Sequence, residues 1–414
     1  MFDSRPLRDN VDFRRYWLGQ VASDFGTQLS LVAFPLLVLS LGGSPAQAGG
    51  IATGSLVART VCRLPAGVLV DRWDRRRVMV ASDLIRAVAL GSIPLAALVG
   101  SVGYPQMVIV AIVEGAVGSV FWPAAAASIR RLVPPQQLTA AMASSQARVT
   151  AAGLLGPAIG GWLFAWHRLA PFVGDAVSYL VSALLIGRIS TSLRPDAGNT
   201  ASRDRRLSAG FRWFARHRVL RVAVVFGSVV NLISVSTVLA VVVSAQRHGH
   251  SATTIGLLLA CVGAGSLCGA LVATAIVKRL SLPAVFATLG AGWVATFLVL
   301  MSTSSPWVVG PVLAAVYLLA PSAAILIGKM LIAGAPEDLL GRITTAGGLL
   351  MSGLPALGPL LTGILLVALG ENGTWLVLAA TAVVATLACL PTLRTPERPN
   401  APMEERDEVL RQAR

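Results

Sequence analysis

Residues 67–77, GVLVDRWDRRR, place six charged side chains between two long apolar runs. Charges are costly in hydrocarbon, so this stretch is predicted to form an aqueous loop at the edge of a membrane. Four arginines fall within residues 72–77, and short loops rich in Arg and Lys stay on the cytoplasmic side. Gly67 is expected to let the helix before the loop approach a partner closely. The arginines alone also fit a simple topology anchor, which leaves Asp71 unexplained.

The composition indicates a membrane protein with many spans. The chain has 414 residues, of which 55% are hydrophobic and 13% charged, and its mean hydropathy is +0.72. Soluble domains carry about 25% charged residues. The net charge of +15 comes from basic residues that fall between the apolar runs, so we interpret it as a topology signal rather than a nucleic-acid surface.

Cysteine and histidine give no sign of a disulfide framework or a metal site. The four cysteines lie in apolar segments without CxxC spacing, and the four histidines are scattered near predicted loops. We therefore expect no metal and no cofactor. The polar start and the long first apolar run argue against a cleavable signal peptide.

Twelve apolar runs predict an all-α membrane protein with twelve transmembrane helices, arranged as two pseudo-symmetric six-helix bundles. The spans are placed near 16–41, 48–70, 78–100, 105–127, 138–165, 170–189, 219–244, 252–277, 282–302, 306–328, 340–369 and 374–391. Basic residues gather on the loops of one face, so both termini are predicted to be cytoplasmic.

A polar segment divides these spans. Residues 190–218 are the only long polar stretch inside the chain. We expect a six-helix bundle at 1–189, a cytoplasmic linker at 190–218, a second bundle at 219–391 and a cytoplasmic tail at 392–414. Aromatic residues among arginines favour an amphipathic interfacial helix in the second part of the linker.

An internal repeat supports the division. Gly67 begins a stretch that ends in two basic residues, and Gly269 begins a similar stretch 202 residues later. GPAIGG at 156–161 recurs as GPLLTG at 358–363, again 202 residues later. Two unrelated motifs that share one offset indicate a duplicated half.

The charged loop resembles the signature G-x-x-x-D-R-x-G-R-R of the major facilitator superfamily. The matching residues are Gly67, Asp71, Arg72, Arg75 and Arg76. Asp74 replaces the usual glycine, which is similar to the twelve-helix drug:proton antiporter subgroup that includes macrolide efflux proteins and the enterobactin exporter. FRRYWLGQ at 13–20 and SDLIRA at 82–87 fit the same subgroup. The resemblance implies a transporter that works by alternating access, with no catalytic residues.

A second stretch, AGLLGPAIGG at 152–161, resembles the "antiporter" motif of this family, with Ala152 in place of its first glycine. Its small residues predict close packing between the spans 138–165 and 252–277, and its proline predicts a bend. In the family the motif accompanies proton-coupled export. A kinked, closely packed helix with no bearing on direction explains the same residues. The candidate residues are Gly153, Gly156, Pro157, Gly160 and Gly161.

Charged residues inside the spans are candidates for ion coupling, because a charge in hydrocarbon is costly. Asp24, Glu114, Arg59 and Arg148 lie at a depth of ~12–17 Å, near the midplane. We expect Asp24, and then Glu114, to bind and release protons as access alternates. Alternatively, the two acids only neutralise Arg59, Arg63 or Arg148 as buried ion pairs.

The resemblance also implies a conformational latch. In the outward-open state of the family, the acid matching Asp71, with the arginine that follows it, contacts the cytoplasmic end of the span that begins here near Gly341. A helix N-terminus there favours a carboxylate. Asp83 and Arg86 either complete this charge network or cap their helix. The expected latch residues are Gly67, Asp71, Arg72, Arg75, Arg76, Asp83, Arg86 and Arg342.

Three further expectations concern weaker signals. Asp175 lies near the outer end of the span 170–189 and is expected to be interfacial. Asn231 and Tyr317 are candidate cavity residues in the second half, whose composition suits an apolar substrate surface. Helix packing explains most of the polar residues there equally well.

The sequence thus predicts a proton antiporter that exports small amphipathic molecules, such as drugs, antibiotics or a siderophore-like metabolite. A lipid or lysophospholipid flippase, or a metabolite facilitator of the same fold, is the alternative. HExxH, GxSxG and Walker patterns are absent, so neither an enzyme nor an ATP-driven pump is expected. The expected partners are a small-molecule substrate, protons and lipid, without nucleic acid. The chain is expected to be a monomer with multiple spans in a bacterial cytoplasmic membrane.

Overall fold

Long helices make up the whole architecture. A computed structural model describes residues 7–100, 102–194, 208–334, 336 and 339–394, and within these ranges it contains no strand. Helices α1 to α6 cover Val11–Ser40, Pro45–Arg72, Arg75–Leu98, Tyr104–Leu132, Leu138–Trp166 and Ala170–Gly187. Helices α7 to α11 cover Ser208–Arg216, Arg218–Arg247, Ala252–Arg279, Leu282–Ser302 and Pro306–Gly334. Helices α12 to α14 cover Leu340–Gly353, Gly358–Ala368 and Gly370–Arg394, and the 3₁₀ turns η1 and η2 cover Pro135–Gln137 and Pro355–Leu357.

The charged stretch at residues 67–77 is mostly helical. Helix α2 continues to Arg72 and α3 begins at Arg75, so only residues 73–74 connect them. The Asp74 carboxylate accepts a hydrogen bond from the backbone N–H of Arg76 at 3.0 Å and thereby caps α3. Long arginine side chains can extend from a helix into water, so the charges did not require a long loop.

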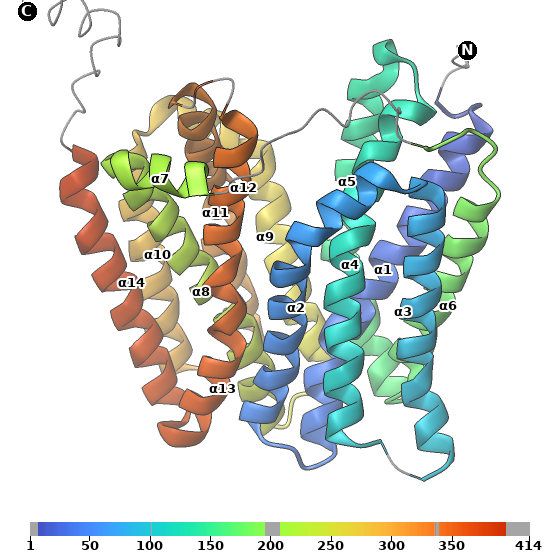
Figure 1. Cartoon of the computed structure of the whole chain (residues 1–414). Helices are drawn as coiled ribbons and strands as arrows, with labels where there is room; N and C mark the ends of the chain where they lie inside the picture. The colour runs from blue at the N-terminus through green and yellow to red at the C-terminus, as the bar shows by residue number, and fades with distance from the viewer. Residues whose placement is uncertain (1–6, 101, 195–207, 335, 337–338, 395–414) are drawn as a thin grey trace, which may run out of the picture.

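The helices form two groups side by side, α1 to α6 and α8 to α14 (Figure 1). Helix α1 begins and α14 ends at the same end of the molecule. The repeat seen in sequence extends to whole helices: α4 (Tyr104–Leu132) corresponds to α11 (Pro306–Gly334) at an offset of 202. The same offset relates α5 to the segment from the start of α12 to the end of α13.

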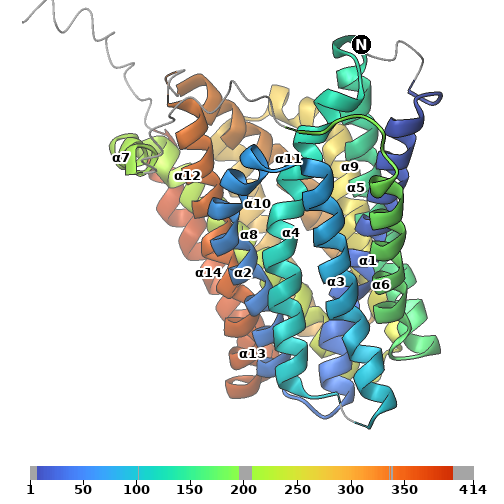
Figure 2. The same cartoon turned by 45° about the vertical axis from the view of Figure 1, so that its right-hand side comes forward.

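Eleven of the described helical segments are long and apolar enough to cross a membrane, which makes this a multi-pass membrane protein. Helix α2 is not among them, although it runs alongside the others in Figure 2. Its sequence includes Arg59 and Arg63 as well as the charged end at Asp71 and Arg72, and these lower its hydropathy. A count of twelve spans therefore remains a proposal.

The predicted span 340–369 agrees with one segment that is long and apolar enough to cross a membrane, Gly341–Ala368. Its helix is irregular in the middle: α12 ends at Gly353, and the turn η2 intervenes before α13 begins at Gly358. Pro355 and Pro359 lack backbone N–H groups, and their rings crowd the preceding turn, which favours a local 3₁₀ turn.

The two groups meet closely at the end opposite the chain termini, where α2 packs on α13 (Figure 1). A Cβ atom at Gly49 would collide with the Pro359 carbonyl, and one at Gly363 would collide with Pro45. The backbone N–H of Leu360 donates to Thr53 Oγ1 across this junction at 3.0 Å. Small residues therefore let the two groups touch through their backbones.

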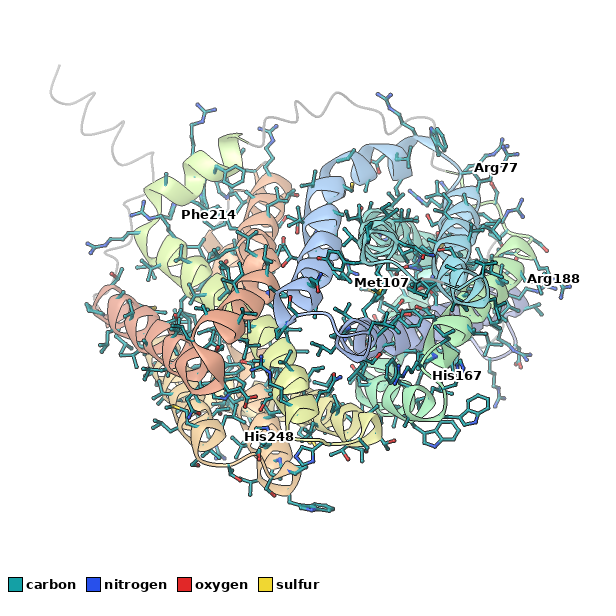
Figure 3. All side chains as sticks on the ribbon, turned by 90° about the horizontal axis from the view of Figure 1, so that it is seen from below. Arg77, Met107, His167, Arg188, Phe214 and His248 are labelled. Atoms are coloured by element: carbon teal, nitrogen blue, oxygen red, sulfur yellow. The ribbon has the colours of Figure 1, made fainter. Side chains whose placement is uncertain are left out.

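The helix predicted in the linker exists as α7, but two of its aromatic side chains do not lie at the membrane interface as expected. Trp213 and Phe214 are 9% and 2% exposed, so they pack inside the protein rather than lie in the interface. Gly210 of α7 approaches the Arg342 carbonyl of α12 so closely that a Cβ would collide with it. Figure 3 shows Phe214 on α7 at the edge of the second group. Residues 195–207 and most of the predicted tail lie outside the described residues.

Candidate functional site

The structure joins two of the charged residues expected near the midplane. The Arg148 guanidinium of α5 donates to Asp24 Oδ2 of α1, and the two side chains are 5% and 7% exposed. Removing one partner of such a pair would strand a charge in a medium of low dielectric. Asp24 and Arg148 therefore form a buried ion pair that ties α1 to α5.

The second acid has a different partner from those expected. Glu114 Oε1 lies 3.6 Å from Nη1 of Arg86, which also contacts Asp83 Oδ1 at 3.1 Å through Nη2. The same Nη2 donates to Ser23 Oγ at 3.0 Å. Asp83 and Arg86 were expected at the latch or as a cap. They are 0% and 2% exposed and lie in the interior of the first group, because α3 carries them more than two turns beyond its start at Arg75.

Aromatic side chains complete this polar interior. The Tyr179 hydroxyl donates to Glu114 Oε1 at 2.7 Å and lies 2.8 Å from Thr27 Oγ1. The Arg86 guanidinium sits 3.9 Å from the centroid of the Tyr179 ring and 4.8 Å from that of Phe121. A guanidinium over an aromatic face is attracted by the ring quadrupole, which helps to hold this cation in the interior.

Asp175 is not interfacial, contrary to the expectation from sequence. Its side chain is 0% exposed, and Ser30 Oγ of α1 lies 2.5 Å from its Oδ2. Gly26 explains the burial: a Cβ there would collide with Asp175 and Ser178, so only a glycine lets α1 pack this tightly on α6. The position of Asp175 near a helix end is therefore misleading, because α1 covers it.

Arg59 and Arg63 do not act as charge partners of the embedded acids in this conformation. Both side chains are exposed, and no ion pair to either is found within the described part of the chain. The Arg63 guanidinium instead lies beside Gly348 of α12, where a Cβ would be 3.7 Å from Nη1. Helix α2 thus turns these arginines away from the interior of the first group and toward the second group.

The residues of the expected latch lie at the end of the molecule where the chain starts. Asp71 and Arg72 are exposed on the last turn of α2, and Arg342 is half-buried on the first turn of α12. A Cβ at Gly67 would have no neighbour within 4 Å, so the prediction that this glycine packs closely on a partner is wrong for this conformation. Its counterpart Gly269 does pack against the backbone of Leu318.

The arginines of the signature have structural contacts of their own. Arg76 Nη1 donates to the Ile189 carbonyl at 2.6 Å, and Arg75 Nη1 donates to the Ala127 carbonyl at 3.4 Å. These bonds fix the start of α3 against the ends of α4 and α6. A latch role for this signature remains a proposal.

The antiporter motif packs α5 against α9, as predicted for the spans 138–165 and 252–277. A Cβ at Gly161 would collide with the Ala252 carbonyl and lie 2.8 Å from the Cα of Gly256. Further along, Gly263 approaches the backbone of Gly153. Gly156 and Gly160 instead face α1, where built Cβ atoms would meet Gln28 and Leu29. Each face of the motif therefore needs small residues for a different neighbour.

A cavity of about 480 Å³ lies between the two groups. Its walls come from α1, α5, α8, α9 and α11, and the polar side chains among them are Gln28, Gln146, Thr150 and Ser266. Gln28 follows Asp24 by one turn, so Asp24 lies on the side of α1 that bears this cavity residue. Arg148 lies on the opposite face of α5 from Gln146 and Thr150 and meets Asp24 there, behind the cavity wall.

The candidate cavity residues of the second half lie elsewhere. Tyr317 is buried, donates to the Ser234 carbonyl at 2.9 Å and packs edge-on against Trp293. Asn231 is exposed, and its Nδ2 lies 3.4 Å from the Met351 carbonyl. Neither belongs to the cavity wall, where Val238, Leu259 and Val262 provide the surface instead. Sequence reasoning missed Gln28, Gln146 and Thr150, although each is a polar residue in an apolar span.

The molecule has two symmetric groups of helices, a cavity between them and buried ion pairs beside the cavity. This architecture is that of a membrane transporter. The chain belongs to the Major Facilitator Superfamily, whose family model matches residues 16–355. Family membership makes it a transporter and not an enzyme.

Several proteins of known name are similar to this chain. The Multidrug efflux pump Tap of Mycobacterium tuberculosis is 28% identical over 393 residues, which cover 89% of this chain and 91% of Tap. The Enterobactin exporter EntS of Escherichia coli is 26% identical over 340 residues, or 81% of each chain. A bacterial homologue of the lysosomal transporter Spinster, solved in an inward-facing and unoccupied conformation, superposes with a TM-score of 0.73 at 17% identity, covering 95% of this chain and 98% of that one. A mutant of the nucleoside transporter NupG gives a TM-score of 0.77 at 12% identity, covering 92% of this chain and all of that one. These two structures show the shared fold alone.

Proposed function

We propose that this protein exports small amphipathic molecules by proton antiport. Two relatives that align over most of the chain are named as an efflux pump and an exporter. The cavity wall supports such substrates, because it combines leucine and valine side chains with a few amides and hydroxyls. Apolar surface favours the body of the substrate, and the amides favour its polar groups.

The observation that carries the proton coupling is the place of the Asp24–Arg148 pair. It is buried and joins the two helices that supply Gln28, Gln146 and Thr150 to the cavity. A cationic or polar substrate bound at Gln28 would lie one turn from Asp24 and compete for its carboxylate. Bound substrate and a bound proton are then alternative partners of the Asp24 carboxylate.

The orientation of the chain is part of the same proposal. Arginines crowd the end of the molecule where α1 begins, so we place that end, with both termini, in the cytoplasm of a bacterial cell and count α2 as a twelfth span. The close junctions of α2 with α13 and of α5 with α9 then close the outer side. The chain acts as a monomer of two bundles, at 1–189 and 219–391.

Proton release from purified protein in detergent tests this proposal. A lipophilic cation and a macrolide are added to unbuffered protein, and the pH is followed with a dye for the parent, Asp24→Asn and Glu114→Gln. We expect substrate to displace protons from the parent and to displace far fewer from Asp24→Asn. Asp9→Asn serves as the control, because Asp9 is an exposed acid whose ion pair among the described residues is with its neighbour Arg8 at 3.8 Å.

If both embedded variants transport and release protons like the parent, these acids are structural counter-ions. A facilitator or lipid-moving role would then replace proton antiport.

A further inference from the structure

Three acids share one cation in the interior of the first group of helices. Asp83, Glu114 and Asp175 are 0%, 7% and 0% exposed, and Arg86 is 2% exposed. Arg86 contacts Asp83 and Glu114. Within the described residues, Asp175 has no ion pair, and its side chain accepts hydrogen bonds from the hydroxyls of Ser30 and Ser178.

The charges of this cluster do not balance. With all three acids ionised, the cluster would carry two excess negative charges in a region that water does not reach. Uncompensated charge is most costly where the dielectric constant is low. One proton on Asp175 neutralises the acid that has no ion pair, and the contacts of Arg86 with Asp83 and Glu114 stay intact.

Two hydroxyls contact the Asp175 carboxyl: Ser30 Oγ donates to Oδ2 at 2.5 Å, and Ser178 Oγ donates to Oδ1 at 3.4 Å. Neither hydroxyl carries a positive charge that would balance an ionised Asp175. The charged and titratable groups that face Asp175 are Glu114 from α4, Arg86 from α3 and Tyr179 on its own helix.

One oxygen of each of the other two acids is left without a hydrogen bond. Asp83 Oδ2 and Glu114 Oε2 are buried and have no hydrogen-bond partner in the described part of the chain, and the same holds for the donors Ser182 Oγ and Arg86 Nε. A further proton on Asp83 or Glu114 would be held at these two carboxylate oxygens.

Helix α1 separates this cluster from the cavity. Ser23, Thr27 and Ser30 face the cluster. Gln28 and Leu31, on a neighbouring face about 100° away, line the cavity. A substrate in the cavity therefore contacts the Asp24 side of α1 and does not reach Asp175.

The three acids are also staggered across the bundle. Asp175 lies five residues from the start of α6, or about 7.5 Å from the end opposite the termini. Glu114 lies ten residues, or about 15 Å, from the start of α4 at the same end. Asp83 lies eight residues, or about 12 Å, from the start of α3 at the end where the termini lie.

We propose that Asp175, Glu114 and Asp83 form a proton-holding site enclosed in the first bundle, separate from the substrate cavity, and that Asp175 is protonated in the conformation seen here. The role in coupling rests on the proposed antiport, whereas the protonation of Asp175 does not.

Infrared spectroscopy of the purified protein tests this directly, because a protonated carboxylic acid has a carbonyl stretch that a carboxylate lacks. Spectra at neutral pH are compared for the parent, Asp175→Asn and the control Asp9→Asn. We expect Asp175→Asn to lose one carboxylic acid band and Asp9→Asn to keep it. Ser30→Ala should shift the same band, because the 2.5 Å contact is lost. This variant keeps the test valid if Asp175→Asn does not fold.

An unchanged band in folded Asp175→Asn and in Ser30→Ala would overturn the proposal. Proton release on substrate addition separates the two proposals. If the parent releases no protons while the Asp175 band is present, the antiport is wrong and the protonated acid stands. If the parent releases protons and the band is absent, antiport proceeds through Asp24 without this site.

Discussion

Replacing Gly161 by alanine should open the junction of the two bundles at the end opposite the chain termini, which we propose to be the outer end. The added Cβ would meet the Ala252 carbonyl and the Cα and N of Gly256, at 2.8 and 3.0 Å from the latter. These are backbone atoms, so α5 and α9 must move apart. Overpacking of this kind costs about 1–3 kcal/mol, and it is relieved in any conformation where the two helices separate. The ratio of molecules with this junction open to molecules with it closed should therefore rise about 5- to 150-fold.

Spin labels at His167 and His248 report this change. The two residues lie at the outer ends of the two groups, as Figure 3 shows in the view from that end. The four native cysteines are first replaced, and the distance distribution is measured by electron double resonance. We expect Gly161→Ala to shift the distribution to longer distances than in the labelled parent.

The matched control is Gly328→Ala. A Cβ at Gly328, inside α11, meets nothing within 4 Å, and both substitutions raise helix propensity by a similar ~1 kcal/mol. Its distribution should match the labelled parent. Equal distributions for Gly161→Ala and the parent, in well-folded protein, would refute the idea that these glycines hold the outer side closed.

Three further predictions concern the buried contacts. Arg86→Met leaves Asp83 and Glu114 without their cation, so it should lower the free energy of unfolding by about 3–5 kcal/mol. The melting temperature should fall accordingly. Low pH should restore it, because protonation neutralises the two acids. Thr53→Val removes the 3.0 Å bond to Leu360 across the junction and should cost about 0.6 kcal/mol, which a parallel melting series against Thr60→Val would detect. Asp12→Ala removes three hydrogen bonds to Ser190 and Thr191, so trypsin should cut the linker several-fold faster in this variant, while equal rates would contradict an anchoring role.

The sequence predicted the helices well because their signals are strong and local. Apolar runs, charged connections and the offset of 202 predicted spans that agree with helices such as α4 and α11. The 3₁₀ turn at Pro355 inside one of these spans was not predicted, because the spans were identified from hydropathy, which a proline in an apolar run scarcely changes.

The pairings within the site were harder to predict. Arg59 and Arg86 both lie in spans with apolar residues on every side, so periodicity does not indicate which face turns inward. Only packing decides that Arg86 meets Glu114 and that Arg59 is exposed. Asp175 was judged by its distance from a helix end, whereas its burial depends on Gly26 in another helix.

Counter-transport in proteoliposomes would show whether this protein couples export to protons. Vesicles with an acidic lumen and an alkaline exterior are mixed with a fluorescent lipophilic cation, and both uptake and luminal pH are followed. The account predicts uptake into the lumen against the cation gradient with coupled loss of luminal protons, abolished by a protonophore and by Asp24→Asn and preserved in Asp9→Asn. Uptake that only equilibrates the cation and leaves the luminal pH unchanged would contradict proton antiport.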